Sequence, residues 1–205
     1  MYPSITIKTG EYYRLFTCAY LHGNIGHIVS NMLALLVLGN SLEKFYGSMA
    51  FFVMTLDFTF FCGAVDFIVN VGLYYFTGGS PFIEYKVPGL GFSAVLFGYL
   101  QVYFGKVRKN PDIQLCGFKI KSGWFVVFYL ILNTLTTPGA SFFGHLSGII
   151  VGFFFNRGFL AFSMPGYATM AAAEAGIWFW RLFASLRCYR MVTSNLRKSQ
   201  CFNRG

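Results

Sequence analysis

Residues 50–76 read AFFVMTLDFTFFCGAVDFIVNVGLYYF, an apolar run whose only charged residues are two aspartates. A transmembrane helix needs about 20 consecutive apolar residues, so this run is long enough to cross a bilayer. It lacks the strict alternation and the length of about 10 residues that are typical of membrane barrel strands. The stretch therefore predicts a membrane-spanning helix and, with the rest of the chain, an all-α membrane protein.

The composition of the whole chain supports this class. Its 205 residues are 56% hydrophobic, 20% aromatic and only 11% charged, whereas soluble domains carry about 25% charged residues. Disordered chains are poor in aromatic residues and rich in charge, so the composition excludes disorder. Five scattered cysteines do not form a disulfide framework. The length favours a single domain.

Four further apolar runs lie before and after residues 50–76. In chain order the five runs are about 25–39, 50–76, 87–104, 124–135 and 142–162, and they are numbered in this order as spans one to five. The runs at 25–39 and 124–135 are short for a bilayer, which implies local thinning or shielding by neighbouring helices. Together the runs predict a polytopic transmembrane helix bundle with five core spans, in one membrane domain over residues 1–163. No metal or cofactor is expected.

Basic residues predict the orientation of this bundle. Lys44, five basic residues within 106–121 and seven from Arg157 onward fall on one side, and only Lys8, Arg14 and Lys86 fall on the other. Because cytoplasmic loops are enriched in lysine and arginine, we expect the loop and the C-terminus in the cytoplasm. The net charge of +9 is then a signal of topology, and no nucleic-acid partner is expected.

The two ends of the chain carry separate expectations. Residues 1–23 are polar and aromatic and contain no signal peptide. The predicted orientation nevertheless puts them on the side of the membrane opposite the cytoplasm, which is called the far side below. We therefore expect a preceding span to lie upstream of this sequence. Residues 164–205 are expected to form a basic cytoplasmic tail with an amphipathic juxtamembrane helix on the anionic leaflet. A sixth span over 166–180 is the alternative, although it would hold Glu174 near its middle.

Polar residues collect at the far-side ends of three spans. His22, His27 and Asn31 lie around the start of the first, Ser93 at the start of the third, and His145 at the start of the fifth. Intramembrane polar groups usually face the bundle interior or a wet cavity. A serine hydroxyl needs a neighbouring base to become a nucleophile, and histidine suits that task near neutral pH. Ser93 and His145 are therefore a candidate nucleophile and base.

Further residues fit around this candidate dyad. His27 and Asn31 are one helical turn apart and point the same way, so with the Ser93 amide they are candidate donors to an oxyanion. Gly91 would let the backbone approach a reacting carbonyl. Gly144, Gly148 and Gly152 form a small-residue stripe that lets another helix approach the fifth span closely.

Each signal also has a plainer interpretation. The Ser93 hydroxyl would ordinarily bond to a carbonyl of its own helix, a histidine at a span end is often interfacial, and the His27/Asn31 pair fits a helix-pairing device. A zinc site lacks a cysteine or carboxylate at ligand spacing. Asp57, Asp66 and Asn70 raise the alternative of a transporter, which would need a repeat of broken helices that the sequence does not contain. Arg14 and Glu43 are expected to anchor loops.

Five segments together resemble the rhomboid family of intramembrane serine proteases, and they follow the family's order over about residues 10–160. They are Tyr13-Arg-Leu-Phe-Thr17, His22 with His27 and Asn31, Asn40–Gly47, Gly91-Phe-Ser-Ala94, and Gly144-His-Leu-Ser-Gly148. The chain is most similar to the endoplasmic-reticulum rhomboids of eukaryotes, the rhomboid-related protein 4 type.

The resemblance implies a function and roles for these residues. Ser93 would be the nucleophile and His145 the general base, while His27, Asn31 and the Ser93 amide would form an oxyanion hole with His22 nearby. Arg14 and Glu43 would hold the loop before the first span. The expected partners are transmembrane protein substrates, the lipid bilayer and degradation machinery at the cytoplasmic tail. The expected location is the endoplasmic reticulum, with the active site facing the lumen.

The chain departs from the family pattern at three points. Ala94 replaces the family's glycine after the serine, Tyr13 replaces a tryptophan, and the first of the family's six spans does not occur in this sequence. The alternative function is a rhomboid-like pseudoprotease that binds membrane clients without cleaving them. Such relatives generally lack the serine or the histidine, and this chain retains both.

Overall fold

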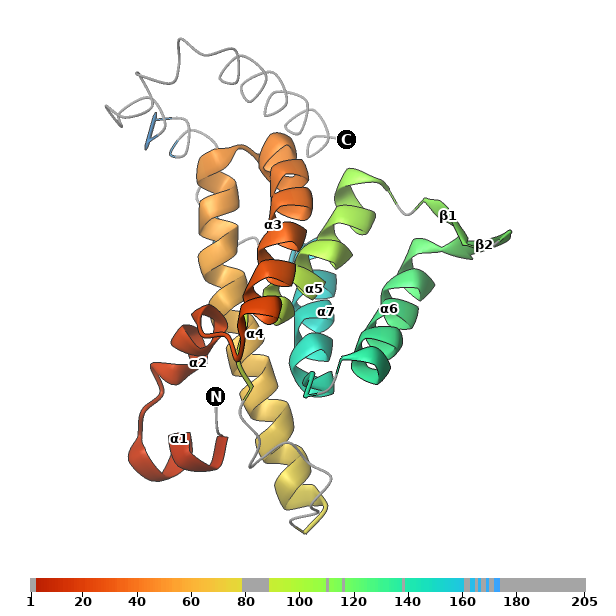
Figure 1. The fold of residues 1–205 in the computed structure, drawn as a ribbon. Helices are drawn as coiled ribbons and strands as arrows, with labels where there is room; N and C mark the ends of the chain where they lie inside the picture. Colours follow the sequence, from red (N-terminus) through yellow and green to blue (C-terminus); the bar gives the residue numbers. More distant parts are fainter. Residues whose placement is uncertain are drawn as a thin grey trace.

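A helix stands at each of the five predicted spans in the computed structural model (Figure 1). These helices are α3 (Ile25–Tyr46), α4 (Ser48–Phe76), α5 (Ser93–Val102), α6 (Ser122–Thr136) and α7 (Phe142–Asn156). A π-helical turn, Tyr103–Val107, continues α5. Before α3 lie α1 (Pro3–Thr9), α2 (Arg14–Thr17) and a 3₁₀ turn, Cys18–Tyr20. The structure describes residues 3–78, 89–109, 111–115, 117–137, 139–160, 163–164, 166, 169 and 172–173.

Several boundaries differ from the sequence-based expectation. Helix α3 continues seven residues beyond Gly39 to Tyr46, and the next residue, Gly47, stops the helix with its φ of +92°. Its polar last turns belong to the fold because Leu42 is fully buried. Helix α5 begins at Ser93 rather than at residue 87, because Gly91 has a φ of +105° that a helix does not allow. Helix α7 ends at Asn156, before Gly158 with its φ of +82°.

The helices differ in their capacity to cross a bilayer. Among the described residues, α3 and α4 are long and apolar enough to do so, while α6 and α7 are shorter apolar helices. On α3, Leu36 and Val37 are 68% and 69% exposed, which is the pattern of a lipid-facing surface rather than of a soluble core helix. The fold is that of a helical membrane protein, and five separate crossings remain a prediction.

Helix α5 lies at the centre of the bundle, with α3, α4 and α7 around it (Figure 1). Its Tyr99 is fully buried against Phe51 and Phe58, and its hydroxyl lies 2.6 Å from Oγ1 of Thr55 on α4. The buried apolar cluster extends from this helix to Met54 of α4 and beyond. Because its surroundings are protein rather than lipid, ten residues of α-helix are enough for a packed central element.

Glycines bring α5 and α7 into backbone contact. A Cβ at position 148 would collide with the carbonyl oxygen of Ala94, and one at position 152 would lie 2.6 Å from the carbonyl oxygen of Gly98. Gly98 itself packs against the ring of Phe58 and the carbonyl oxygen of Gly148. The two helices therefore lie closer than side chains larger than hydrogen would allow.

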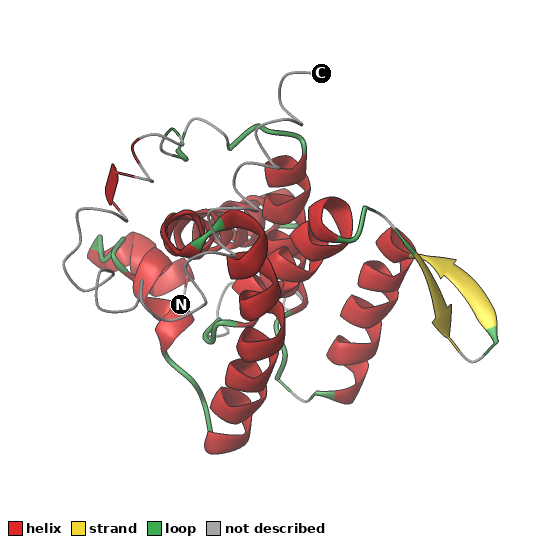
Figure 2. Ribbon diagram, turned by 90° about the horizontal axis from the view of Figure 1, so that it is seen from above, coloured by secondary structure: helices red, strands yellow, loops and turns green. Residues whose placement is uncertain are grey.

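A two-stranded antiparallel hairpin, which the sequence analysis did not predict, lies between α5 and α6. Its strands are β1 (Asp112–Leu115) and β2 (Phe118–Lys121), and Figure 2 shows that it projects from the helices. The predicted tail over residues 164–205, including both alternatives for 166–180, lies almost entirely outside the described residues.

Candidate active site

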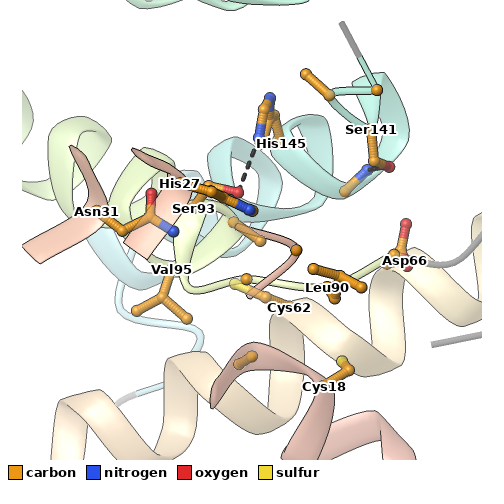
Figure 3. Close-up of a pocket in the computed structure, with 18 of the residues that line it drawn as sticks. Cys18, His27, Asn31, Cys62, Asp66, Leu90, Ser93, Val95, Ser141 and His145 are labelled. Carbon is orange, nitrogen blue, oxygen red and sulfur yellow. Dashed lines mark hydrogen bonds between the residues drawn. The ribbon is translucent and has the colours of Figure 1, made fainter. Parts of the chain in front are cut away.

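Ser93 is the first residue of α5, and His145 lies in the first turn of α7. Gly91, with its φ of +105°, lies two residues before Ser93, so α5 begins directly after this turn. The start of α7 is fixed by Ser141, whose hydroxyl oxygen accepts the backbone N–H of Gly144 at 2.9 Å. Figure 3 shows the two side chains pointing toward one another from these helix starts.

The Oγ of Ser93 lies 2.9 Å from Nε2 of His145, within hydrogen-bond distance. If Nε2 is to accept the serine proton, the imidazole must carry its own proton on Nδ1. Nδ1 is buried without a hydrogen-bond partner in the described part of the chain, so no carboxylate orients the ring there. The ring is instead stacked on Phe97, with the centroids 4.5 Å apart. Packing therefore sets the orientation of this imidazole.

His27 and Asn31 face the same region from the first turns of α3. Asn24 caps this helix by accepting the backbone N–H of His27 at 2.8 Å. A Cβ at Gly91 would lie 2.5 Å from Cε1 of His27. The glycine thus brings the backbone before Ser93 against the His27 ring.

His22 supports Asn31 from outside the helix. Its Nε2 lies 3.0 Å from Nδ2 of Asn31 and 3.5 Å from the backbone nitrogen of Phe92. Two N–H groups point at this nitrogen, so it acts as an acceptor. The Asn31 amide has a second N–H, which remains for another acceptor.

The side chains of Ser93, His145, His27 and Asn31 line one cavity of about 690 Å³. Its wall includes Ser93, His145, His27 and Asn31 on one side, and Cys18, Cys62 and Asp66 on another (Figure 3). Asp66 accepts a hydrogen bond from Nδ2 of Asn70, one turn further along α4, at 2.9 Å. A hydroxyl, an imidazole and amide donors are therefore present together around one cavity, as acyl transfer requires.

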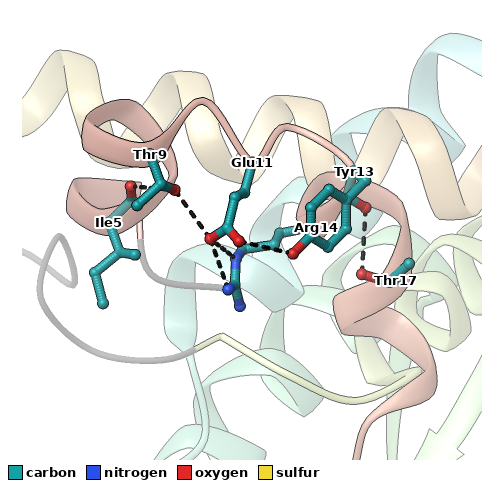
Figure 4. A network of polar contacts seen from close by, with 6 residues as sticks. All are labelled: Ile5, Thr9, Glu11, Tyr13, Arg14 and Thr17. Carbon is teal, nitrogen blue, oxygen red and sulfur yellow. Dashed lines mark hydrogen bonds and ion pairs between the residues drawn. The ribbon is translucent and has the colours of Figure 1, made fainter.

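Arg14 and Glu43, which the resemblance placed together, lie in different parts of the fold. Arg14 pairs with Glu11, which accepts from Nε at 2.9 Å and from Nη2 at 2.7 Å (Figure 4). Glu43 lies at the α3–α4 junction and accepts the Ser48 hydroxyl at 2.6 Å. Arg14 therefore holds the segment before α3, whereas Glu43 acts at the other end of that helix.

The electrostatics of this segment follow from the same contacts. The hydrogen bonds from Arg14, Tyr13 and Thr9 lower the pKa of the Glu11 carboxyl, and the bond from Glu11 raises the pKa of Arg14. Both groups remain charged near neutral pH. Burial raises the pKa of the Cys18 thiol on the cavity wall, so this cysteine is a neutral thiol there.

Sequence reasoning missed several residues of the site. Phe97 is four residues after Ser93 on the same helix, and a search for an aromatic residue at that spacing would have indicated it. Ser141 is an N-cap three residues before Gly144, which is a standard helix-start signal. Glu11 gave no signal beyond its proximity to Arg14 in the sequence.

A Rhomboid domain matches residues 9–162, so the chain belongs to the rhomboid family. This family comprises helical membrane proteins, generally serine intramembrane proteases, and includes inactive members.

Several relatives align with most of the chain at modest sequence identity. It is 27% identical to Rhomboid-like protein 15 of Arabidopsis thaliana over 180 residues, which are 86% of this chain and 44% of the relative. It is 28% identical to Rhomboid-related protein 4 of Homo sapiens over 166 residues, 81% of this chain and 52% of the relative. With Rhomboid-type serine protease 2 of Neurospora crassa it shares 27% over 154 residues, 75% of this chain and 53% of the relative. The chain thus spans about half the length of the curated relatives it matches.

Proposed function

We propose that this chain is an intramembrane serine endopeptidase that cleaves transmembrane proteins through Ser93 and His145. The observation that carries the proposal is the 2.9 Å approach of Ser93 Oγ to Nε2 of His145 inside a cavity. Family membership supports it, because rhomboid proteins act on transmembrane substrates within the bilayer. One relative is named a serine protease.

The proposed reaction begins when Ser93 Oγ attacks the scissile carbonyl carbon and its proton passes to Nε2 of His145. The carbonyl oxygen becomes an oxyanion, which accepts N–H donors from the Ser93 backbone, from Asn31 and from His27. The imidazolium then returns the proton to the amine that leaves as the C–N bond breaks. This step leaves an acyl-enzyme on Ser93.

Water completes the cycle from the cavity. His145 takes a proton from the water as it attacks the ester carbonyl, and then returns that proton to Ser93 Oγ as the ester bond breaks. Over the whole cycle the serine proton leaves on the amine, and a proton from water replaces it on Ser93 Oγ through the same imidazole. The pair is a dyad, so the Phe97 ring and the α5–α7 contact take over the orienting role that a carboxylate has in a triad.

The location proposed for this reaction is the membrane of the endoplasmic reticulum, with the cavity toward the lumen and the C-terminus in the cytoplasm. Similarity to Rhomboid-related protein 4 and the 13-to-3 distribution of basic residues support it. Degradation machinery is the proposed partner of the cytoplasmic tail.

The test is cleavage of a transmembrane reporter by the purified chain in lipid vesicles. Ser93→Ala is expected to lower the rate on the order of 10⁴-fold or more, as loss of a serine nucleophile does elsewhere. Ser41→Ala is the matched control, because the Ser41 hydroxyl donates to the Val37 carbonyl of its own helix, away from the cavity. Cleavage that survives Ser93→Ala contradicts the mechanism, and reporter binding without cleavage by the unaltered chain would indicate a pseudoprotease.

A further inference from the structure

The β1–β2 hairpin has one apolar and one polar face. In its ladder Ile113 pairs with Ile120 and Leu115 with Phe118, whereas Asp112 pairs with Lys121 and Gln114 with Lys119. Side chains of directly opposite residues lie on the same face, and successive residues alternate between faces. The apolar face therefore carries Ile113, Leu115, Phe118 and Ile120, and the polar face carries Asp112, Gln114, Lys119 and Lys121.

The described part of the protein leaves this apolar face only partly covered, because Ile113, Leu115 and Ile120 are half-buried and Phe118 is exposed. Figure 2 shows the hairpin extending from the start of α6, away from the other helices, and Phe118 is 74% exposed. A two-stranded hairpin is marginally stable by itself in water and gains stability when it packs on an apolar surface. The alternation of this hairpin therefore fits a boundary at which its apolar face contacts an apolar surface and its polar face contacts water.

The neighbouring helix indicates which surface that is. Trp124, two residues into α6 and next to the hairpin, is 70% exposed. The outward side of α6 continues this exposed apolar surface with Val127, Phe128, Ile131, Leu132 and Leu135. Tryptophan is enriched where a transmembrane helix meets the membrane–water interface. The exposed apolar surface of α6 therefore continues to the hairpin, and Trp124 indicates that the hairpin lies at the depth of the membrane–water interface.

The charge around the hairpin selects the kind of lipid. Residues 106–121 contain five basic residues and one acidic residue, Asp112. Lys119 and Lys121 are exposed on the polar face, and Lys106, Arg108 and Lys109 are exposed just before β1. A β layer with its side chains is about 10 Å thick, which is comparable with the screening length of about 8 Å in physiological salt. These cations therefore remain within electrostatic reach of an anionic headgroup layer beneath the apolar face.

We propose that the β1–β2 hairpin is a membrane-docking element that lays its apolar face on the interfacial region of an anionic leaflet. The docked leaflet is the one at the end of α5 opposite Ser93, because the hairpin follows the C-terminal end of that helix. This binding surface lies apart from the candidate active site, so the docking proposal does not depend on the proposed protease activity.

The experiment compares probes on the two faces of the hairpin in the full chain. Phe118→Cys and Gln114→Cys are made in a chain whose five native cysteines are replaced, and each is labelled with an environment-sensitive fluorophore. The labelled chains are reconstituted in phosphatidylcholine vesicles with or without about 30% phosphatidylserine. Nitroxide-bearing lipids and aqueous iodide then report contact with the bilayer and with water, respectively.

Docking predicts stronger nitroxide quenching at position 118 than at position 114, and a further rise at 118 with phosphatidylserine. Adding Lys119→Gln and Lys121→Gln is expected to reduce the docked-to-undocked ratio at 118 by roughly five-fold per lysine. Equal iodide quenching at both positions in both vesicles overturns the proposal and leaves a protein partner as the occupant of the apolar face.

A second measurement covers the case in which the cysteine-free chain does not fold. In a chain that retains all cysteines but carries Trp178→Phe and Trp180→Phe, Trp124 is the sole tryptophan. Brominated phosphatidylserine is expected to quench it, and Phe118→Ser with Ile120→Ser is expected to weaken that quenching. Quenching that does not change with these substitutions overturns the proposal.

Discussion

Asn31 has two amide hydrogens, and among the described residues one acceptor, His22, lies in hydrogen-bond contact with them. His22 accepts one N–H, and the proposed mechanism assigns the other to the oxyanion. Asn31→Ala is therefore expected to lower kcat by about 10²–10³-fold with little change in KM, as removal of an oxyanion donor does. The measurement is steady-state cleavage of a reporter in vesicles, with Asn40→Ala, at an exposed position further along α3, as the control. A raised KM with an unchanged kcat would assign Asn31 to substrate binding alone.

Glu11 makes stability depend on pH in a defined direction. Its pKa is lowered in the folded chain, mainly by Arg14 and then by Tyr13 and Thr9. A lowered carboxyl pKa adds stability above the unfolded-state value of about 4.3, and this stability is lost as the pH falls through the folded-state value. Glu11→Gln is therefore expected to lower the melting temperature at pH 7.

The same difference is expected to shrink as the medium is acidified below the ordinary glutamate range. Thermal unfolding in detergent across this pH interval measures it. A melting-temperature difference that stays constant with pH would show that the Glu11 charge does not stabilise the segment before α3.

The residues that line the cavity were predictable only where the chemistry of a residue type is narrow, and their roles stay predictions. Ser93, His145, His27 and Asn31 belong to a small set of groups able to perform or support acyl transfer, and all of them line the cavity. Glu11 and Phe97 act through partners that sequence distance does not reveal. Glu43 was assigned by resemblance to the loop before α3, and it lies instead at the α3–α4 junction because a 22-residue helix carries it there.

Helices α5 and α7 determine whether Ser93 and His145 meet. Their backbones touch at Gly148, where an added Cβ would collide with the carbonyl oxygen of Ala94. Gly148→Ala is expected to separate the helices, to destabilise the fold by about 1–3 kcal/mol as overpacking does, and to reduce cleavage by misplacing His145.

Gly72→Ala is the matched control for this prediction. Gly72 lies within α4, and a Cβ there meets no described atom within 4 Å. Helix propensity alone then acts, so the melting temperature should stay unchanged or rise slightly. If thermal unfolding shows the same effect for both substitutions, close α5–α7 contact is not what holds the site together.

The existence of these elements was more predictable than their ends. Long apolar runs specify helices by composition, and all five helices stand where such runs occur. The start of α5 depends on the positive φ of Gly91, and the pattern of apolar residues does not predict this backbone conformation. The hairpin went unnoticed because its alternation is only four residues per strand and lies within a segment dominated by charge.

The molecule as a whole has two chemically different ends. One carries the cavity with Ser93 and His145, and the other carries the hairpin and its exposed basic residues. The rule that cytoplasmic segments are basic predicts that the hairpin end lies in the cytoplasm. Neither the number of crossings nor their direction follows from packing alone, because lipid and its charge set both.

Labelling in sealed endoplasmic-reticulum microsomes, whose outer face is cytoplasmic, tests this orientation. A chain with Cys116 as its sole cysteine is expected to react with a membrane-impermeant maleimide without permeabilisation. A chain with only Ile25→Cys, a position that is 81% exposed at the start of α3, should react only after permeabilisation. The reverse pattern would invert the proposed topology.

The proposed protease activity depends on the nucleophilicity that His145 confers on Ser93. The decisive measurement is the rate and site of labelling by a fluorophosphonate, with the adduct located by mass spectrometry in the folded, vesicle-bound chain. We expect the adduct on Ser93, and we expect His145→Ala to slow its formation by on the order of 10³-fold or more. A chain that cleaves the reporter without forming an adduct on Ser93 would contradict the proposed dyad mechanism. Equal labelling rates with and without His145 would contradict it too.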